Sequence, residues 1–268
     1  MGRPVRIPRV VTRAVARVKP RVPRSAWPLL LTLRSMAGNG PLVGLPRCRR
    51  ALVLAAHPDD ESLGCAGTIA LLADTGTTVS LLVATDGEAT RGSSLPPAQT
   101  AARRRAEGER SAALLGASAR FLGMPDGCLT ERRAELANAI ARCIAELRPD
   151  IVFLPWFLDG HPDHRAVSDA FVTTVVGLAP GIEAWGYETW TPLPPNRLVD
   201  ITAVVDRKRA SLAAHATAHL AFDVDAGLGL ARWRSMHGLL GEGYAEAFLA
   251  LDAPAYADLA RRTAAPGP

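Results

Sequence analysis

Apolar runs alternate with helical patterns over most of the chain from about residue 50. Residues 51–55 form a continuous apolar run, which is typical of a strand buried on both faces of a parallel sheet. Similar runs occur at residues 78–85 and 151–154, with a shorter one at 119–122. The pattern therefore predicts four strands at these positions, and two later strands at 182–187 and 198–201.

The segments between these strands have the pattern of helices. We predict helices over 62–73, 98–115, 131–147, 168–178 and 204–218. Gly76, Gly116 and Pro149 mark helix ends, because glycine favours the turn after a helix and proline cannot continue one. The chain after residue 218 is less regular and contains several glycines, and we assign no element there.

Regular alternation of strand and helix predicts an α/β fold. The expected architecture is a three-layer sandwich with a mostly parallel sheet, formed as a single domain by residues 49–268. A chain of 268 residues with 48% hydrophobic residues is large enough to bury one such core. In folds of this class the site lies beyond the carboxyl ends of the strands, so the loops that follow strands are the places to search.

Charge separates residues 1–48 from the rest of the chain. The net charge is +5, yet residues 1–58 contain no Asp or Glu. We predict a basic, proline-containing, flexible leader over 1–48. A short amphipathic helix around Arg9, Arg13 and Arg17 would suit peripheral contact with an anionic membrane surface or an acidic partner. Nucleic-acid binding would rest on electrostatics alone, and we do not expect it.

Cysteine usage and hydropathy bear on the cellular compartment. The four cysteines, Cys48, Cys65, Cys128 and Cys143, are widely spaced and form no CxxC pair, which argues against a disulfide framework or a cysteine-zinc site. No stretch reaches the eighteen or so apolar residues that a membrane span needs. We therefore predict a cytoplasmic protein, with peripheral membrane contact through the leader left open.

Two His-Pro-Asp triplets, each after a predicted buried strand, carry the candidate chemistry. The first is His57-Pro-Asp-Asp-Glu61 and the second is His161-Pro-Asp-His164. Neutral imidazoles and a carboxylate suit Zn²⁺, which in catalytic sites takes three protein ligands and leaves one position open. His57 and Asp60 can converge on one ion across a strand-to-helix turn, and His164 is the candidate third ligand.

The remaining residues of the two triplets suit a hydrolytic reaction. Asp59 would be free to accept a proton from water. His161 would stabilise a developing oxyanion or protonate a leaving amine, with Asp163 orienting its imidazole. The alternative is that Asp59, Asp60 or Asp163 caps the helix that follows it.

The paired motifs resemble the LmbE-like, or PIG-L, family of N-acetylglucosaminyl deacetylases. Weaker similarities follow in the family's order and span roughly residues 50 to 250: Thr85–Glu88, Arg104–Glu107, Met124–Gly127, Val199–Thr202, Lys208, His215–Thr217 and Tyr244–Phe248.

The resemblance implies a Rossmann-like fold, a single zinc ion held by His57, Asp60 and His164, and Asp59 as general base. It also implies a substrate contact from Arg104 and a contact from Asp126 to sugar hydroxyls. The alternatives are a solvated charge for Arg104 and a plain turn residue for Asp126. Other divalent first-row ions would also suit such a ligand set.

The expected function is therefore zinc-dependent removal of an N-acyl group, with acetyl favoured, from an amino sugar or glycoconjugate. One alternative keeps the site and changes the substrate to a thiol conjugate, a glycopeptide or a lipid-linked sugar. Another is a metal-holding, sugar-binding module without turnover. Asp59 argues against the last, because binding alone has no need of a free carboxylate beside the metal.

Overall fold

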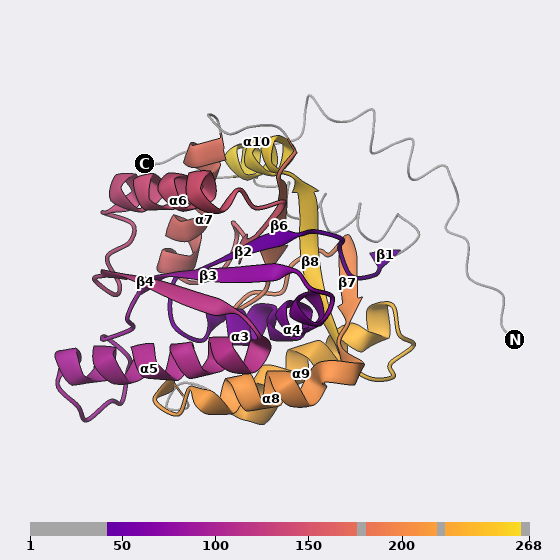
Figure 1. The fold of residues 1–268 in the computed structure, drawn as a ribbon, viewed down its shortest axis with the longest axis horizontal. Helices are drawn as coiled ribbons and strands as arrows, with labels where there is room; N and C mark the ends of the chain where they lie inside the picture. The colour runs from indigo at the N-terminus through magenta and orange to yellow at the C-terminus, as the bar shows by residue number, and fades with distance from the viewer. Residues whose placement is uncertain (1–41, 176–180, 219–222, 264–268) are drawn as a thin grey trace, which may run out of the picture.

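Eight strands form one sheet in the computed structural model, which describes residues 42–175, 181–218 and 223–263 (Figure 1). In sheet order they are β1 (Leu42–Val43), β7 (Arg197–Asp200), β8 (Ala245–Asp252), β6 (Glu183–Tyr187), β5 (Ile151–Pro155), β2 (Arg50–Ala55), β3 (Thr78–Thr85) and β4 (Ser118–Met124). Only β8 runs antiparallel to its neighbours, β6 and β7. The mostly parallel α/β fold predicted from the sequence is thus confirmed.

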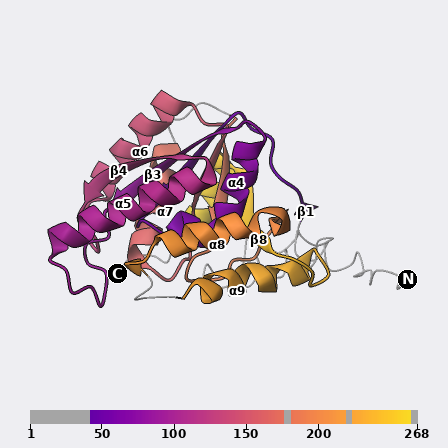
Figure 2. The ribbon, with the colours of Figure 1, turned by 60° about the horizontal axis from the view of Figure 1, so that its bottom comes forward.

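Helices cover both faces of this sheet, as Figures 1 and 2 show from two directions. One layer contains α3 (Asp60–Gly64), α4 (Ala66–Asp74), α5 (Pro97–Leu115), α8 (Val205–Ala214) and α9 (Val224–Arg234). The other contains α6 (Arg133–Leu147), α7 (Pro162–Val175) and α10 (Ala253–Thr263). The arrangement is therefore a three-layer sandwich.

Each central strand contributes to both hydrophobic cores, because successive side chains point to opposite faces of a sheet. Leu52 and Leu54 of β2 lie in the core on the α6–α7–α10 side. Val53, between them, lies in the core under α4 and α5 together with Phe153 of β5. Burial on both faces explains why these strands are continuous apolar runs in the sequence.

The predicted elements up to residue 214 are found with small shifts of their ends. The helix expected over 62–73 is divided at Cys65 into α3 and α4. Helix α7 begins at Pro162 and contains residues 168–175 of the stretch predicted to be helical, and residues 176–178 lie outside the described residues. The helix expected over 204–218 ends at Ala214.

The absence of an assignment after residue 218 was wrong. Helix α9, strand β8 and helix α10 occupy most of that region. Strand β8 fills the position between β6 and β7, and both of these partners lie much earlier in the chain. A pairing of this kind is set by the tertiary fold rather than by local pattern. One local signal was available: Asp223 caps α9 by accepting from the amides of Asp225 and Ala226.

The leader predicted over 1–48 is described only from residue 42. Residues 1–41, with the proposed amphipathic helix, lie outside the described residues. Leu42 and Val43 pair with β7, and Leu45 and Cys48 pack against the core, so this end of the leader is integrated into the domain. Within the described part of the chain, no helix combines the length and the apolar character needed to cross a membrane.

A buried ion pair connects three elements on the α8 side of the sheet. Lys208 of α8 is fully buried, and its Nζ donates to Glu246 Oε1 of β8 at 2.7 Å. The Glu246 carboxylate also accepts from the amides of Gly67 and Thr68, in the first turn of α4. Because β8 was not predicted, this ion pair was not expected either.

We expect Lys208→Met to lower the free energy of unfolding by about 3 kcal/mol. Removing one partner of a buried ion pair leaves the other charge uncompensated, a loss of roughly 3–5 kcal/mol in general. The three hydrogen bonds that Glu246 keeps place the estimate at the low end. Urea denaturation measures the change. Arg209→Met is the matched control on the same helix, because the Arg209–Asp225 pair is exposed to solvent and should contribute little to stability. Equal losses in the two variants would contradict the expectation.

Candidate functional site

The two histidine motifs meet at the carboxyl edge of the sheet, where the strand order changes direction. The chain runs from β2 to β3 and β4 on one side, then returns to β5 and β6 on the other. His57 and Asp60 follow β2, and His164 follows its neighbour β5. Crevices at such a switch point are where open α/β sheets bind their ligands.

The side chains of the three predicted ligands face one another. His164 Nε2 lies 3.0 Å from Asp60 Oδ1 and 3.3 Å from His57 Nδ1. His57 Nδ1 lies 3.7 Å from Asp60 Oδ2. Ligands of a tetrahedral zinc ion, bound at about 2.0–2.1 Å, lie about 3.3 Å apart. The two distances from His164 therefore match the spacing of zinc ligands, and the donor set fits a small divalent ion in chemistry.

Backbone contacts fix the Asp60 carboxylate in this arrangement. Its Oδ2 accepts from the amides of Ala56 and His57 at 2.8 Å each, which leaves Oδ1 facing His164. Asp59 stands at the start of α3 but makes no side-chain capping bond. The helix-cap alternative for Asp59 therefore does not apply.

Asp59 is paired with Arg104 of α5. Arg104 Nη2 donates to Asp59 Oδ2 at 2.9 Å and to the carbonyl of Pro58 at 2.8 Å. Its Nη1 donates to the carbonyl of Gly87 and to the hydroxyl of Thr90. The Arg104 side chain is only 6% exposed, so it is not a solvated surface charge.

His161 lies beside two of the predicted metal ligands, with its ring centroid 4.8 Å from that of His57 and 4.7 Å from that of His164. Its Nδ1 accepts from the backbone amide of Asp163 at 3.2 Å. An accepting Nδ1 carries no proton, so the neutral ring carries its proton on Nε2 and can donate from there. Burial, together with the neighbouring His57 and His164, lowers the pKa of His161 and favours this neutral form.

The carboxylates of Asp163 and Asp126 both face His57 rather than His161. His57 Nε2 lies 3.0 Å from Asp126 Oδ1 and 3.4 Å from Asp163 Oδ2. Asp163 also accepts from the amides of Gly127 and Leu129. The orienting contact expected from the Asp163 side chain to His161 is thus made by its backbone amide, because the carboxylate is engaged by the turn after β4.

Comparison with known proteins gives this arrangement a family. Residues 52–175 match the family model PIG-L, described as GlcNAc-PI de-N-acetylase. A diacetylchitobiose deacetylase of Thermococcus kodakarensis is 34% identical over 62% of this chain and 69% of its own length. The chain belongs to the PIG-L family. A 1D-myo-inositol 2-acetamido-2-deoxy-alpha-D-glucopyranoside deacetylase of Kineococcus radiotolerans is 30% identical over 75% of this chain and 81% of its own.

The fold agrees with that of a solved relative. The structure of N,N'-diacetylchitobiose deacetylase from Pyrococcus horikoshii superimposes with a TM-score of 0.65 at 28% sequence identity. The match covers 78% of this chain and 86% of the relative. The PIG-L resemblance seen in the sequence is confirmed, and the chain is an enzyme of a deacetylase family.

In this PIG-L member, Asp159 orients a predicted metal ligand, although it was not among the predicted site residues. Asp159 is 1% exposed, and its Oδ1 lies 2.9 Å from His164 Nδ1. Its Oδ2 accepts from the hydroxyl of Thr189 and the amides of Trp190 and Thr191, in the loop after β6. A carboxylate behind a ligating histidine fixes the tautomer and the orientation of the ring. The sequence contains one indication of this role, since Asp159 is an acidic residue two positions before the second histidine motif.

Charge in the site favours ionised carboxylates beside cationic imidazoles when metal is absent. Burial alone would lower the pKa of His164, but Asp60 and Asp159 raise it to about 9. Burial likewise opposes the protonation of His57, yet its contacts with Asp126, Asp163 and Asp60 hold the pKa well above its usual value. The carboxylates that favour the protonated form of these two histidine rings also favour the binding of a divalent cation.

The pKa of Asp59 shifts in the opposite sense to that of the ligand carboxylate next to it. Burial raises the pKa of Asp59, and the nearby charge of Arg104 only partly offsets this. Burial would also raise the pKa of Asp60, but His164 and His57 hold it well below its usual value. The two neighbouring aspartates therefore differ in basicity, with Asp59 the better proton acceptor.

Two further groups of side chains could share an ion. Nitrogens of His57, His161 and His164 lie within 4.8 Å of one another. So do ligand atoms of His57, Asp126 and Asp163. His57 belongs to both groups, and its two ring nitrogens face opposite sides of the cluster. The members of both groups are therefore all close to His57.

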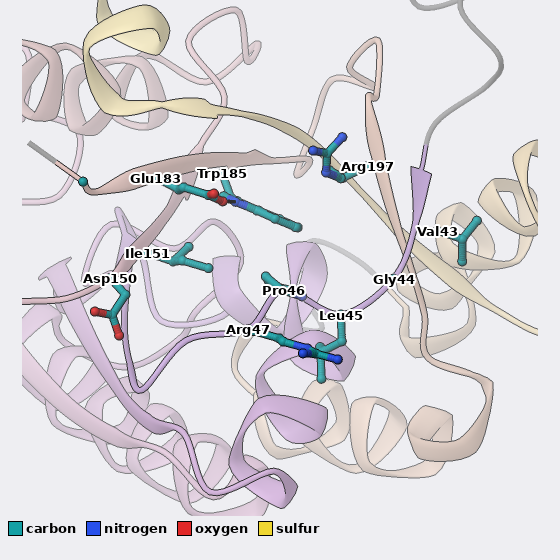
Figure 3. A pocket seen from close by; sticks show the side chains of 11 residues that line it. Val43, Gly44, Leu45, Pro46, Arg47, Asp150, Ile151, Glu183, Trp185 and Arg197 are labelled. Atoms are coloured by element: carbon teal, nitrogen blue, oxygen red, sulfur yellow. Dashed lines mark hydrogen bonds between the residues drawn. The ribbon is translucent and has the colours of Figure 1, made fainter.

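A separate cavity of about 400 Å³ lies at the opposite, amino edge of the sheet (Figure 3). Asp150, Glu183 and Arg197 line it, at the starts of β5, β6 and β7. Asp150 accepts from the amides of Arg49 and Arg50, and Glu183 accepts from the indole of Trp185. This cavity is remote from the histidine motifs and offers none of their chemistry, so it is not the active site.

We expect Asp159→Asn to weaken divalent-metal binding about 10–100-fold. An amide cannot hold the imidazole of His164 with the same charge and polarity, and loss of such an orienting carboxylate has effects of this size. Titration of Zn²⁺ against a competing chelator measures the affinity. Asp169→Asn in α7 is the control, because that side chain is half exposed and its ion pair is with Arg133, at 3.5 Å. An unchanged affinity in Asp159→Asn would remove Asp159 from the metal site.

Proposed function

We propose that this PIG-L enzyme is a zinc-dependent hydrolase that removes the N-acetyl group of an amino sugar. The observation that carries the proposal is the carboxylate of Asp59. It lies beside three convergent metal ligands, is held by Arg104 at 2.9 Å, and takes no part in capping α3. A basic carboxylate next to a metal position is what activation of water requires.

The substrate class rests on the relatives. Those compared here are named as deacetylases of diacetylchitobiose and of an inositol-linked 2-acetamido sugar. A relative from Bacillus anthracis, 32% identical, is named as a probable deacetylase of an N-acetylglucosaminyl malate. Their names share a 2-acetamido sugar and differ in what it is attached to. We therefore propose an N-acetylated amino sugar, with the attached group open to test.

His57, Asp60 and His164 are the proposed ligands. Two imidazoles and one carboxylate at mutual distances of 3.0–3.7 Å suit Zn²⁺, although other first-row divalent ions accept the same donors. Bound there, the ion would act as a Lewis acid and lower the pKa of water.

The reaction then follows from the positions of two side chains. Asp59 accepts a proton as the water oxygen forms a bond to the acyl carbon. The Nε2–H of His161 donates to the oxyanion that develops on the acyl oxygen. Asp59 next returns its proton to the nitrogen as the C–N bond breaks. The products are acetate and a free amine, and no further reactant is needed.

Arg104 and Asp126 support these residues in the proposal. Both terminal nitrogens of Arg104 are engaged by the protein, so its first role is to orient the carboxylate of Asp59. Asp126 contacts His57 through one oxygen and the amide of Ala89 through the other. Contacts of either residue with substrate hydroxyls remain predictions from the family resemblance.

We expect Asp59→Asn to keep its metal and lose deacetylation by about 10²–10⁴-fold, the usual contribution of a general base. The assay measures amine release from N-acetylglucosamine, N,N'-diacetylchitobiose and the inositol-linked 2-acetamido sugar, with metal-loaded and chelated protein. Metal content is measured on the same samples. Asp86→Asn is the control, because Asp86 pairs with Arg105 at the rim and not with Arg104.

Three results would separate the alternatives. Chelator-sensitive release that is lost in Asp59→Asn supports the proposal and ranks the substrates. Full activity in Asp59→Asn would refute its role as base. Stoichiometric metal with no release from any of the three sugars would favour a different amide or a binding module.

We expect zinc binding at pH 7 to release more than one proton. In the metal-free protein the raised pKa values of His57 and His164 keep both rings protonated, and ligation needs them neutral. Affinity should therefore rise with pH up to about 9, where His164 loses its proton. Calorimetric titration in two buffers of different ionisation enthalpy counts the protons. Binding without proton release would contradict these rings as ligands.

A further inference from the structure

The backbone of Asp59 is strained. Its φ is 144° and its ψ is −20°. Among non-glycine residues of the described chain, only Arg148 and Leu240 also have positive φ, at 48° and 56°, inside the ordinary left-handed region. Asp59 lies outside that region, which costs on the order of 1–3 kcal/mol. Such a conformation persists only where neighbouring groups hold it.

Glu61 holds the amide of the strained residue. Asp59 N donates to Glu61 Oε2 at 3.4 Å, across the turn between β2 and α3. The Glu61 side chain is 1% exposed, so its carboxylate is out of reach of bulk water. Burial of a charged group at this depth is unfavourable unless hydrogen bonds compensate for it.

The other oxygen of Glu61 is fixed from three directions. Its Oε1 accepts from Ser62 of α3 at 2.8 Å and from Ser111 of α5 at 3.2 Å. His215, directly after α8, brings Nε2 within 3.4 Å of the same oxygen. Ser211 of α8 lies 2.6 Å from Ser62 and 2.7 Å from Ser111, which closes the network. The carboxylate of Glu61 is therefore immobilised by the helical layer behind the active site.

We propose that Glu61 is a positioning residue that acts through Asp59. One carboxylate oxygen is locked by the network of Ser62, Ser111, Ser211 and His215. The other holds the Asp59 amide and with it the strained turn. That turn directs the Asp59 side chain toward Arg104 instead of into the first turn of α3. The inference rests on the proposed function, because it gives Asp59 the role of base.

Two substitutions distinguish positioning from a charge effect. Glu61→Gln removes the charge but keeps an oxygen at full length for the Asp59 amide, while its NH₂ group can donate to the serine hydroxyls. Glu61→Asp keeps the charge but withdraws both oxygens by one methylene. Positioning predicts that Gln retains kcat within about fivefold and that Asp lowers it about 10²-fold, as a displacement of about 1 Å can. KM and metal content should change little in either variant.

Glu107→Asp is the matched control. Glu107 lies on α5, is 1% exposed, and accepts from the amide and the hydroxyl of Thr217. The same shortening at this second buried glutamate should lower thermal stability by a similar amount and leave kcat within about twofold. A fall in kcat equal to that of Glu61→Asp would overturn the inference, because general loosening of the layer would then explain both.

A double-substitution cycle tests the route of the effect. If Glu61 acts only through Asp59, then Glu61→Asp should not lower the residual metal-dependent rate of Asp59→Ala any further. The assay uses the metal-loaded protein and N,N'-diacetylchitobiose, or whichever of the three sugars the unsubstituted protein deacetylates fastest. Additive losses, or an inactive Glu61→Gln beside an active Glu61→Asp, would overturn the inference. Absence of activity in the unsubstituted protein would instead refute the proposed function.

Discussion

The parallel pairing of β2 with β5 is the constraint on which the site depends. Register between Ala51 and Ile151 places the carboxyl ends of the two strands side by side, although the strands are a hundred residues apart in the chain. Each strand then delivers one histidine motif to the same point. The site therefore depends on the apolar runs that form these strands, because a slip in register would separate His57 from His164.

The central part of the fold was predictable because its signals are local. Strands such as β3 are buried on both faces and leave uninterrupted apolar runs, and Gly116 ends α5 in the left-handed conformation expected of a glycine after a helix. Strand β8 also contains an apolar run, at residues 247–251, but its place between β6 and β7 is set by the tertiary fold, and Glu246 is buried there because it meets Lys208. The burial of Glu246 can be predicted only when its ion-pair partner is known, and that partner, Lys208, lies 38 residues earlier in the chain.

The same distinction applies to the site. Metal-ligand chemistry is carried by residue type and spacing, so His57, Asp60 and His164 could be proposed from the motifs. The hydrogen bonds and ion pairs that orient these residues could not be predicted from the motifs. Asp159 orients His164 through a loop from another strand, and Asp163 faces His57 although it is adjacent in sequence to His164. Side-chain direction at a turn depends on which backbone amides are left to bind, and that is a property of the assembled fold.

The loop after β6 supports Asp159 and also exposes an aromatic side chain at the surface. Thr189, Trp190 and Thr191 bind Asp159 on the inner side, while the indole of Trp190 is 55% exposed on the outer side. The same loop begins at Glu188, which is paired with Arg234 of α9. Exchange of this loop between relatives to alter substrate preference would therefore also change the support of His164, a proposed metal ligand. Substitutions at this rim that spare Asp159 are therefore expected to be those of outward-pointing side chains, with the backbone and the threonine hydroxyls retained.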